Sequence, residues 1–473
     1  MNLEFIRPTL KYIPEIELPK RHVPFKEKMI WTIAILFLFF VMGVIYPVNV
    51  EPTDLPASYQ QFAIIFASHM GTIISAGIGP IVTASIILQL LVGAKMLDID
   101  LTKPEGKALF QGTQKILTVF IAIFEAGAIV VGFKLGAQYL GTSWAITNPF
   151  VMFTIGQIAL GSILLMYMDE IVSKWGIGSG IGLFIAAGVS QEIVNASLTF
   201  LGWIDAQRFP DVLGYIPNFI EKAGQGAFDF TLLFPIIATI IVFLVVVFCE
   251  AMRIEIPLSY GSVRGVGGRY PIRFFYVSNI PVILAAALLA NVQLLPTLVG
   301  INAYSPQPIG EMNILQRIVY ETVSYITIGN LNGILNPSNI ERLLDGAVLL
   351  HLAIYLLVFI ALCILFGKFW IETTGLSSEQ VAEQIQGGGM QIPGFRRDKR
   401  VIQKVLDRYI PQITIISSVA VGLLAAGADL LGAIGSGTGI LLTVGIIYRL
   451  YEEVQKEQMS EMHPAFKKFM NKA

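Results

Sequence analysis

The sequence predicts an all-α polytopic membrane protein with ten transmembrane helices. Hydrophobic residues make up 55% of the 473 positions and charged residues only 14%, against about 25% charged residues in an average soluble domain. The mean hydropathy is +0.69. Several stretches of about 20 apolar residues carry almost no charge, and about 20 residues is the length that a helix needs to cross a bilayer. These observations exclude a chain of soluble domains.

Each of the ten expected helices corresponds to one apolar stretch of the sequence. The expected spans cover residues 29–47, 73–94, 113–133, 147–168, 178–198, 231–251, 274–294, 346–369, 411–431 and 437–451. The first stretch follows a polar arm, residues 1–28, and lacks a small-residue cleavage site, so we expect a membrane span there and not a cleaved signal peptide. We expect the arm to be amphipathic and to lie along the cytosolic membrane surface.

Basic residues are distributed unequally between the two sides of this topology. With the N-terminus inside, 27 of the 32 Lys and Arg residues fall in inner segments and only 5 in outer ones. Short cytoplasmic loops attract Lys and Arg. We therefore expect both termini in the cytoplasm, which requires an even number of spans.

The second span is preceded by a segment that is too long for the same crossing. The apolar stretch from Pro56 to Gly93 is interrupted by glycines and by Pro80, and proline disrupts a helix interior. A broken helix inside a membrane is tolerated where it is buried in protein or lines a cavity. We expect a half-helix at about residues 57–70 followed by a full span; the alternative is a re-entrant packing helix with no further role.

A six-residue motif occurs twice, at Ile177–Gly182 and at Ile434–Gly439, with five of six residues identical. Each copy begins the last span of a five-span half, and the two spans run in opposite directions. This is typical of the inverted repeats of membrane transport proteins. It divides the chain into an N-terminal half, 29–225, and a C-terminal half, 226–473. The alternative is chance, because small residues are common where membrane helices pack closely.

Three segments carry a family resemblance. Thr72–Leu91 resembles the second-span signature of the SecY family of protein-translocation channels, and Asp169–Phe184 resembles the signature before and within its fifth span. The turn at Ile392–Arg396 is a third match. Arg397 and Asp398 replace a Pro-Gly pair that is usual in bacterial members, so the resemblance is to the archaeal branch.

The resemblance implies a central hourglass pore between the two halves, closed by a ring of apolar side chains and plugged from outside by the half-helix. Carried over by motif, the ring is Ile78, Val82, Ile181, Ile185, Ile283 and Leu442. Branched aliphatic side chains can close around any polypeptide without hydrogen-bonding it, and a dry constriction resists ions. The alternative is that these are ordinary packing residues.

Glu125 stands out without the resemblance, because it lies midway along the third expected span. A charged group there costs about 2.5–3.5 kcal/mol on insertion scales, and such residues are usually functional. The resemblance places Thr83, Glu125 and Asn291 in a polar cluster at a lateral gate, where a hydrophobic signal sequence enters the membrane. Alternatively, Glu125 is a hydrogen-bonding group that holds helices together.

Two expected cytosolic loops are strongly basic. Glycines in Arg253–Arg273 suggest a hairpin, and Ile371–Ile410 is the second loop. The resemblance implies that these loops dock the ribosome, whose phosphates attract Lys and Arg. The implied docking residues are Arg264, Arg269, Arg396, Arg397, Lys399 and Arg400. The alternative is the ordinary enrichment of positive charge on the inner side.

The function implied by the resemblance is the central pore-forming subunit of a Sec protein translocase in the plasma membrane. Such a subunit is a passive channel for secreted polypeptides, a lateral gate for membrane proteins, and not an enzyme. The implied partners are two small single-span subunits, one like SecE or the gamma subunit and one like the beta subunit. Further partners are the ribosome, signal sequences, nascent polypeptides and membrane lipid.

Two other functional classes remain as alternatives. A secondary transporter with inverted repeats usually carries several ionisable groups in its spans, whereas here only Glu125 is deep, with Glu192 and Asp429 nearer the outer ends. An intramembrane serine protease would need a Ser–His pair, and the single span histidine, His351, is near an outer end. Cys249 and Cys363 lie in apolar runs and the four histidines are scattered, so we expect no metal or cofactor.

Overall fold

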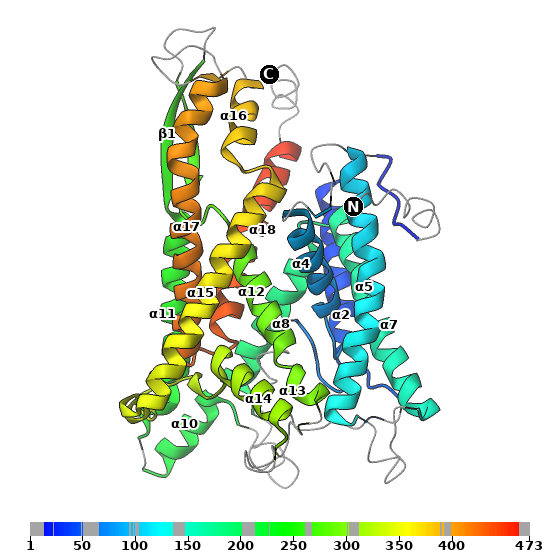
Figure 1. Cartoon of the computed structure of the whole chain (residues 1–473), viewed down its shortest axis with the longest axis vertical. Helices are drawn as coiled ribbons and strands as arrows, with labels where there is room; N and C mark the ends of the chain where they lie inside the picture. The colour runs from blue at the N-terminus through cyan, green and yellow to red at the C-terminus, as the bar shows by residue number, and fades with distance from the viewer. Residues whose placement is uncertain are drawn as a thin grey trace.

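The structure is a computed structural model of the chain. It describes residues 14–21, 23–48, 50, 66–93, 96–97, 99, 104–135, 147–200, 213–226, 228–260, 267–299, 301, 312–387, 390–391 and 399–462. Upright helices dominate it and stand in two groups side by side (Figure 1). One group contains the blue and cyan helices of the first part of the chain, and the other contains green to red helices of the second part.

A helix occupies each of the ten expected spans. In the first half these are α2 (Phe25–Met42), α4 (Gly79–Gly93), α5 (Pro104–Phe133), α7 (Pro149–Trp175) and α8 (Gly180–Leu198). In the second half they are α11 (Phe234–Ala251), α12 (Ile280–Val292), α15 (Gly346–Thr374), α17 (Lys399–Leu431) and α18 (Gly437–Met462).

The surface of these helices is that of a membrane protein. By length and composition, six of the described helical segments can cross a bilayer, and α4 and α12 are apolar but shorter. Large apolar side chains are exposed on the outside of the helices, among them Phe120, Phe153 and Phe248. Water would oppose such exposure, whereas lipid tails solvate it.

Two helices begin later than expected. We expected spans from residues 73 and 274, but α4 begins at Gly79 and α12 at Ile280. Each has a proline as its second residue, Pro80 and Pro281, and proline fits a first helical turn because it has no amide hydrogen to pair there. The apolar residues before each proline form turns, so α4 and α12 start inside the expected spans.

The segment before α4 also differs from the expectation. Phe66–Met70, the described end of the expected half-helix, consists of turns and not helix; residues 57–65 lie outside the described part of the chain. The carbonyl of Phe66 accepts a hydrogen bond from the Ile78 amide at 2.9 Å. This hydrogen bond closes residues 66–78 into a loop that leads directly into α4. The segment before α4 is therefore a loop and not a separate helix.

A small sheet accompanies the helices, so an all-α description is incomplete. β1 (Arg253–Tyr260) and β2 (Gly267–Arg273) pair antiparallel from Arg253 opposite Arg273 to Ser259 opposite Gly267. The expected hairpin is therefore confirmed. The short β3 (Met390–Gln391) joins the other edge of β1, giving the order β2-β1-β3.

The second basic loop is partly helical, which corrects the expectation of a loop from residue 371 to 410. α15 continues to Thr374, α16 covers Ser378–Gly387, and α17 begins at Lys399 and continues through Pro411. Ile402, Leu406 and Ile410 of α17 pack with Val381 and Ile385 of α16. Packing of this apolar face on α16 stabilises the first turns of α17, which are too polar to be recognised from hydropathy as part of a membrane span.

Short helices on the opposite, lower side of Figure 1 were not expected, because they are short or amphipathic. They are α10 (Tyr215–Gly224), α13 (Leu295–Leu298), α14 (Ile314–Ile326) and the 3-10 turns η3 (Phe230–Leu233), η5 (Gly329–Leu331) and η6 (Ile340–Leu344). The groups of long helices meet where α4 packs on α12 and α15, and where α8 packs on α18. One hydrophobic core runs through both groups.

Candidate pore and gate site

A cavity of about 360 Å³ lies where α4, α8, α12 and α18 meet. Five of the six expected ring residues line it: Val82, Ile181, Ile185, Ile283 and Leu442. Polar groups line it too, including Ser85, Ser179, Asn279, Arg449 and Glu453. Helices from both groups thus contribute aliphatic side chains to one space.

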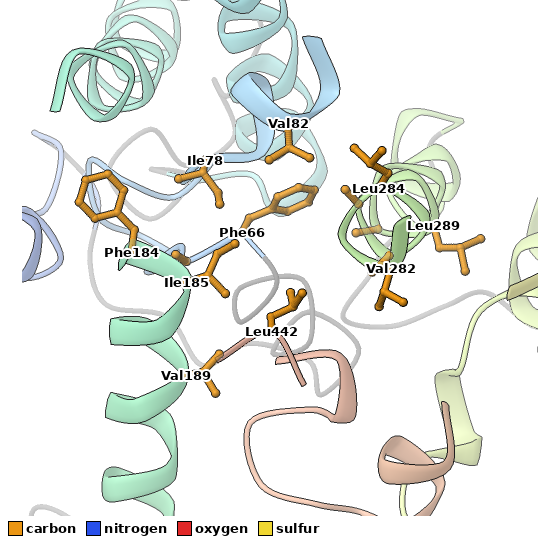
Figure 2. Packing of buried hydrophobic residues seen from close by; sticks show 14 of the residues in the cluster. Phe66, Ile78, Val82, Phe184, Ile185, Val189, Val282, Leu284, Leu289 and Leu442 are labelled. Carbon is orange, nitrogen blue, oxygen red and sulfur yellow. The ribbon is translucent and has the colours of Figure 1, made fainter. Parts of the chain in front are cut away.

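The ring residues divide into two sets by burial. Ile78, Val82, Ile185 and Leu442 are at most 5% exposed, and Figure 2 shows their side chains gathered around the phenyl ring of Phe66. Ile181 and Ile283 are partly exposed and also line the cavity. The cavity is therefore bordered on one side by a closely packed apolar layer.

Phe66 was not singled out from the sequence. It is fully buried among the expected ring residues, and it belongs to the turn segment before α4. No helical or strand periodicity marks a residue in a turn, so the sequence has no signal for this contact beyond the aromatic side chain itself.

The three residues of the expected gate cluster are close together. The Asn291 side-chain amide donates to Thr83 Oγ1 at 2.8 Å, and the Thr83 hydroxyl donates to Glu125 Oε1 at 2.8 Å. These bonds link α12 to α4 and α4 to α5. Glu125 is only 2% exposed, and its Oε2 atom has no hydrogen-bond partner among the described residues.

The Asn291–Thr83 bond crosses the seam along which α4 packs on α12 and α15. Toward the other end of α4, a Cβ atom added at Gly93 would lie 2.4 Å from the ring of Phe369 on α15. Contact this close requires glycine. The seam is therefore closed in this structure, with a polar bridge near the start of α4 and a tight aromatic contact at its end.

The expected docking residues are only partly described. Lys399 makes ion pairs with Glu379, at 3.1 Å, and with Glu383, both on α16, and Arg400 is exposed. Arg269 lies on β2 opposite Pro257. Arg264, Arg396 and Arg397 lie outside the described residues, so the structure does not bring the six residues together.

The base of the hairpin is held by residues that the sequence did not single out. Arg253 and Arg273 both form ion pairs with Glu452 of α18, at 3.2 and 2.6 Å. A hydrogen bond to the Tyr448 hydroxyl raises the pKa of the Arg253 guanidinium, so this group stays charged. These contacts fix the direction in which the hairpin leaves the helices.

The described residues contain no group of three or more His, Cys, Asp or Glu side chains that could hold a metal ion. Within the same residues, both cysteines are free thiols. The site offers apolar closure and a hydrogen-bonded seam rather than reactive groups.

A multi-pass helical membrane protein with a cavity between two helix groups, lined by aliphatic side chains from both, fits the class of membrane channels and transporters. A family model for SecY matches residues 72–451. The SecY subunit of the protein translocase from Methanocaldococcus jannaschii is 46% identical, over 98% of this chain and 99% of its own. The SecY subunit from Pyrococcus horikoshii is 43% identical, over 97% of each chain.

Solved structures agree with these relatives. The chain in "The structure of a protein conducting channel" is 43% identical, with a TM-score of 0.79 over 97% of this chain and 99% of that one. The chain in "Sec61 in the Canine ribosome-channel complex from the endoplasmic reticulum" has a TM-score of 0.77 at 43% identity, with 97% and 99% covered. The chain belongs to the SecY family. It is the pore-forming subunit of a Sec protein-conducting channel, a transporter and not an enzyme.

Proposed function

We propose that the chain folds as ten spans in two inverted halves, 29–225 and 226–473, around an hourglass pore. Residues 1–28 form a cytosolic arm, and the segment at about 57–70 plugs the pore from outside. Secreted polypeptides pass through the pore passively, and hydrophobic segments leave sideways into the plasma membrane. Both termini are cytoplasmic, as the distribution of Lys and Arg favours.

The observation that carries this proposal is the equivalence of residues that meet in the cavity. Ile185 and Leu442 occupy the same position after the two copies of the repeated motif. Val82 and Ile283 likewise each follow the helix-starting proline, Pro80 or Pro281, by two positions. All four line one cavity, so equivalent positions of both halves supply its walls, as expected for a site between inverted repeats.

The ring seals the resting channel because its members are apolar and closely packed. Ile78, Val82, Ile185 and Leu442 are at most 5% exposed and lie around the buried Phe66, and an apolar constriction is costly for an ion to enter. Aliphatic side chains make no directional bonds, so the ring can widen around polypeptides of different sequence.

The gate cluster makes the closed seam weaker than a wholly apolar one. Asn291 and Thr83 form a hydrogen-bonded chain to Glu125, whose Oε2 atom has no partner among the described residues, and a buried polar group without a full set of partners is destabilising. When an apolar signal helix enters between α4 and α12, its apolar contacts with these helices replace the contacts of the closed seam. The cluster would thus set how hydrophobic a signal must be.

The driving force comes from partners. A relative 43% identical to this chain is described in a ribosome-channel complex, and we propose that the ribosome docks here on the β1–β2 hairpin and the segment 392–408. Arg264, Arg269, Arg396, Arg397, Lys399 and Arg400 supply positive charge there. Two small single-span subunits, one SecE-like and one beta-like, complete the complex.

If these residues dock the ribosome, charge reversal should lower the ribosome affinity in a salt-dependent way. With Arg396→Glu and Arg400→Glu together, we expect ribosomes to bind about tenfold or more weakly at low salt, because two phosphate contacts become repulsive. The difference should shrink as salt rises, because the missing interaction is electrostatic. Co-sedimentation of the detergent-solubilised complex with ribosomes over a salt series measures it.

The matched control is Arg317→Glu with Arg342→Glu, which makes the same change of charge in segments expected outside. We expect this control to bind ribosomes as the unmodified protein does. Equal affinity of both double variants at low salt would contradict the docking role.

A further inference from the structure

Both copies of the repeated motif are held by a threonine of another helix. The Ile177 amide donates to Thr32 Oγ1 at 3.0 Å, and the Ile434 amide donates to Thr239 Oγ1 at 2.9 Å. Ile177 and Ile434 are the first residues of the two motif copies. Thr32 lies on α2 and Thr239 on α11, the first long helix of each half.

An aspartate makes the second contact in each copy. Asp169 of α7 accepts a hydrogen bond from the Ile181 amide at 2.8 Å and interacts with the Gly180 amide. Asp429 of α17 accepts one from the Gly437 amide at 2.5 Å. The first amides of a helix have no partner within the helix, so each aspartate caps the helix that follows its own.

The glycines of the motif are explained by the same geometry. Gly178 and Gly435 have φ of +77° and +79°, a left-handed conformation that glycine adopts without strain. A Cβ atom on Gly180 would lie 2.5 Å from Asp169 Cα, and one on Gly437 would lie 2.1 Å from the Ala425 carbonyl oxygen. The start of each helix is therefore pressed against the preceding helix, within reach of the capping aspartate.

We propose that Thr32 with Asp169, and Thr239 with Asp429, are positioning residues for the pore seal. Each pair, which we call a clasp, fixes where α8 or α18 begins, and thereby holds Ile181, Ile185 and Leu442 at the level of the ring. This inference rests on the proposed pore function. It adds residues that touch neither the cavity nor the translocating chain but determine whether the ring closes.

The connection from clasp to ring is short. The amide of Ile181 is itself a clasp partner, Ile185 lies one turn further along α8, and Leu442 lies five residues after Gly437 on α18. A slip of one residue in an α-helix moves a side chain by about 1.5 Å along the axis and by about 100° around it. Such a slip would turn a ring residue away from its neighbours.

The clasps connect helices within each group rather than between the groups. One joins α2, α7 and α8, and the other joins α11, α17 and α18. Each half would therefore keep the ring residues of α8 or α18 in place while the seam at α4 and α12 opens. The seal could then widen without loss of its alignment.

The test removes the threonine acceptor of each clasp and leaves the aspartate in place. Thr32→Val and Thr239→Val keep the shape of the side chain but leave the buried Ile177 or Ile434 amide unpaired. Matched controls are Thr154→Val in α7 and Thr414→Val in α17. Their hydroxyls donate to the carbonyl four residues earlier, as those of Thr32 and Thr239 do, but within the described residues they accept no amide from another helix.

Resting ion conductance in planar bilayers is the main readout. We expect each clasp variant to leak about five- to a hundredfold more than wild type, the factor that corresponds to one unpaired buried amide. The control variants should stay near wild type, and Thr32→Ser with Thr239→Ser, which keeps both acceptors, should restore the seal. Thermal unfolding of all variants is measured in parallel.

Two results would overturn the inference. One is a leak in the clasp variants that is no greater than in the controls, or an equal leak in the serine variants, which keep both acceptors. The other is failure of the valine variants alone to accumulate, which would assign the threonines to folding. Replacing Val82, Ile185 and Leu442 with glycine separates the positioning role from the proposed seal. If this ring variant leaks while the clasp variants stay tight, only the positioning role is refuted. If the ring variant does not leak, the seal itself is refuted.

Discussion

Replacing Val82, Ile185 and Leu442 together with glycine should make the resting channel leak ions strongly. These residues come from α4, α8 and α18 and are at most 5% exposed, so their removal opens a path through the layer around Phe66 (Figure 2). A single replacement should leak little, because the neighbouring side chains still fill the gap. Deletion of residues 57–67 in the triple variant should increase the leak further. Conductance in planar bilayers measures each step.

Two controls separate a seal from ordinary packing. Ile87→Gly, Val194→Gly and Ile447→Gly change the exposed faces of the same three helices. Ile129→Gly, Ile158→Gly and Val246→Gly remove buried side chains away from the cavity. Large-to-small changes in a core cost about 2–5 kcal/mol each, so the second control should lower stability without conducting. Conductance in either control equal to that of the ring variant would show that the ring is packing only.

Replacing Asn291 with Leu should raise the hydrophobicity that a signal sequence needs in order to open the gate. The Asn291–Thr83 bond is the polar link across the seam. Leucine removes the polar group and its bond together, while the Thr83 hydroxyl still donates to Glu125. Asn291 is partly buried, and taking a polar group out of water without full pairing costs about 1–3 kcal/mol, so the efficiency of weakly hydrophobic signals should fall severalfold. A graded series of signal sequences in a translocation assay measures the shift.

The control for this variant is Gln114→Leu. Gln114 donates to Ser85 Oγ at 2.6 Å, so the change removes a similar polar bond, but between α5 and α4 within one half. We expect its signal selectivity to match wild type. If Asn291→Leu leaves selectivity unchanged, or relaxes it, the cluster only holds helices together.

The helices of the core could be predicted from the sequence, because each expected span is an apolar run of suitable length. The first residues of two of these helices could not be predicted. The residues before Pro80 and before Pro281 are apolar but form turns, and hydropathy does not distinguish a turn from a helix. The first turns of α17 were not predicted because they are polar, and hydropathy finds only apolar helices. They are helical because Ile402 and Leu406 pack on α16 rather than on lipid.

The site could be predicted only through the family resemblance. Ile185 and Leu442 are chemically the same as dozens of other aliphatic residues, and their position at the cavity is a property of the fold. Glu125 was recognisable alone, because a carboxyl group in an apolar run is unusual. The contacts of Thr32 and Thr239 join residues 145 and 195 positions apart, and no local pattern marks them.

The most direct test of the channel is to find which residues a translocating polypeptide touches. A photo-crosslinking amino acid is placed at Ile185 or Leu442, and at the exposed positions Val194 and Ile447 of the same helices. A secretory chain is then arrested during translocation and the complex is irradiated. If the chain passes between the two halves, crosslinks to it form at Ile185 and Leu442 and not at Val194 or Ile447. Crosslinks at the exposed positions alone, or at none of the four, would contradict a pore through this cavity.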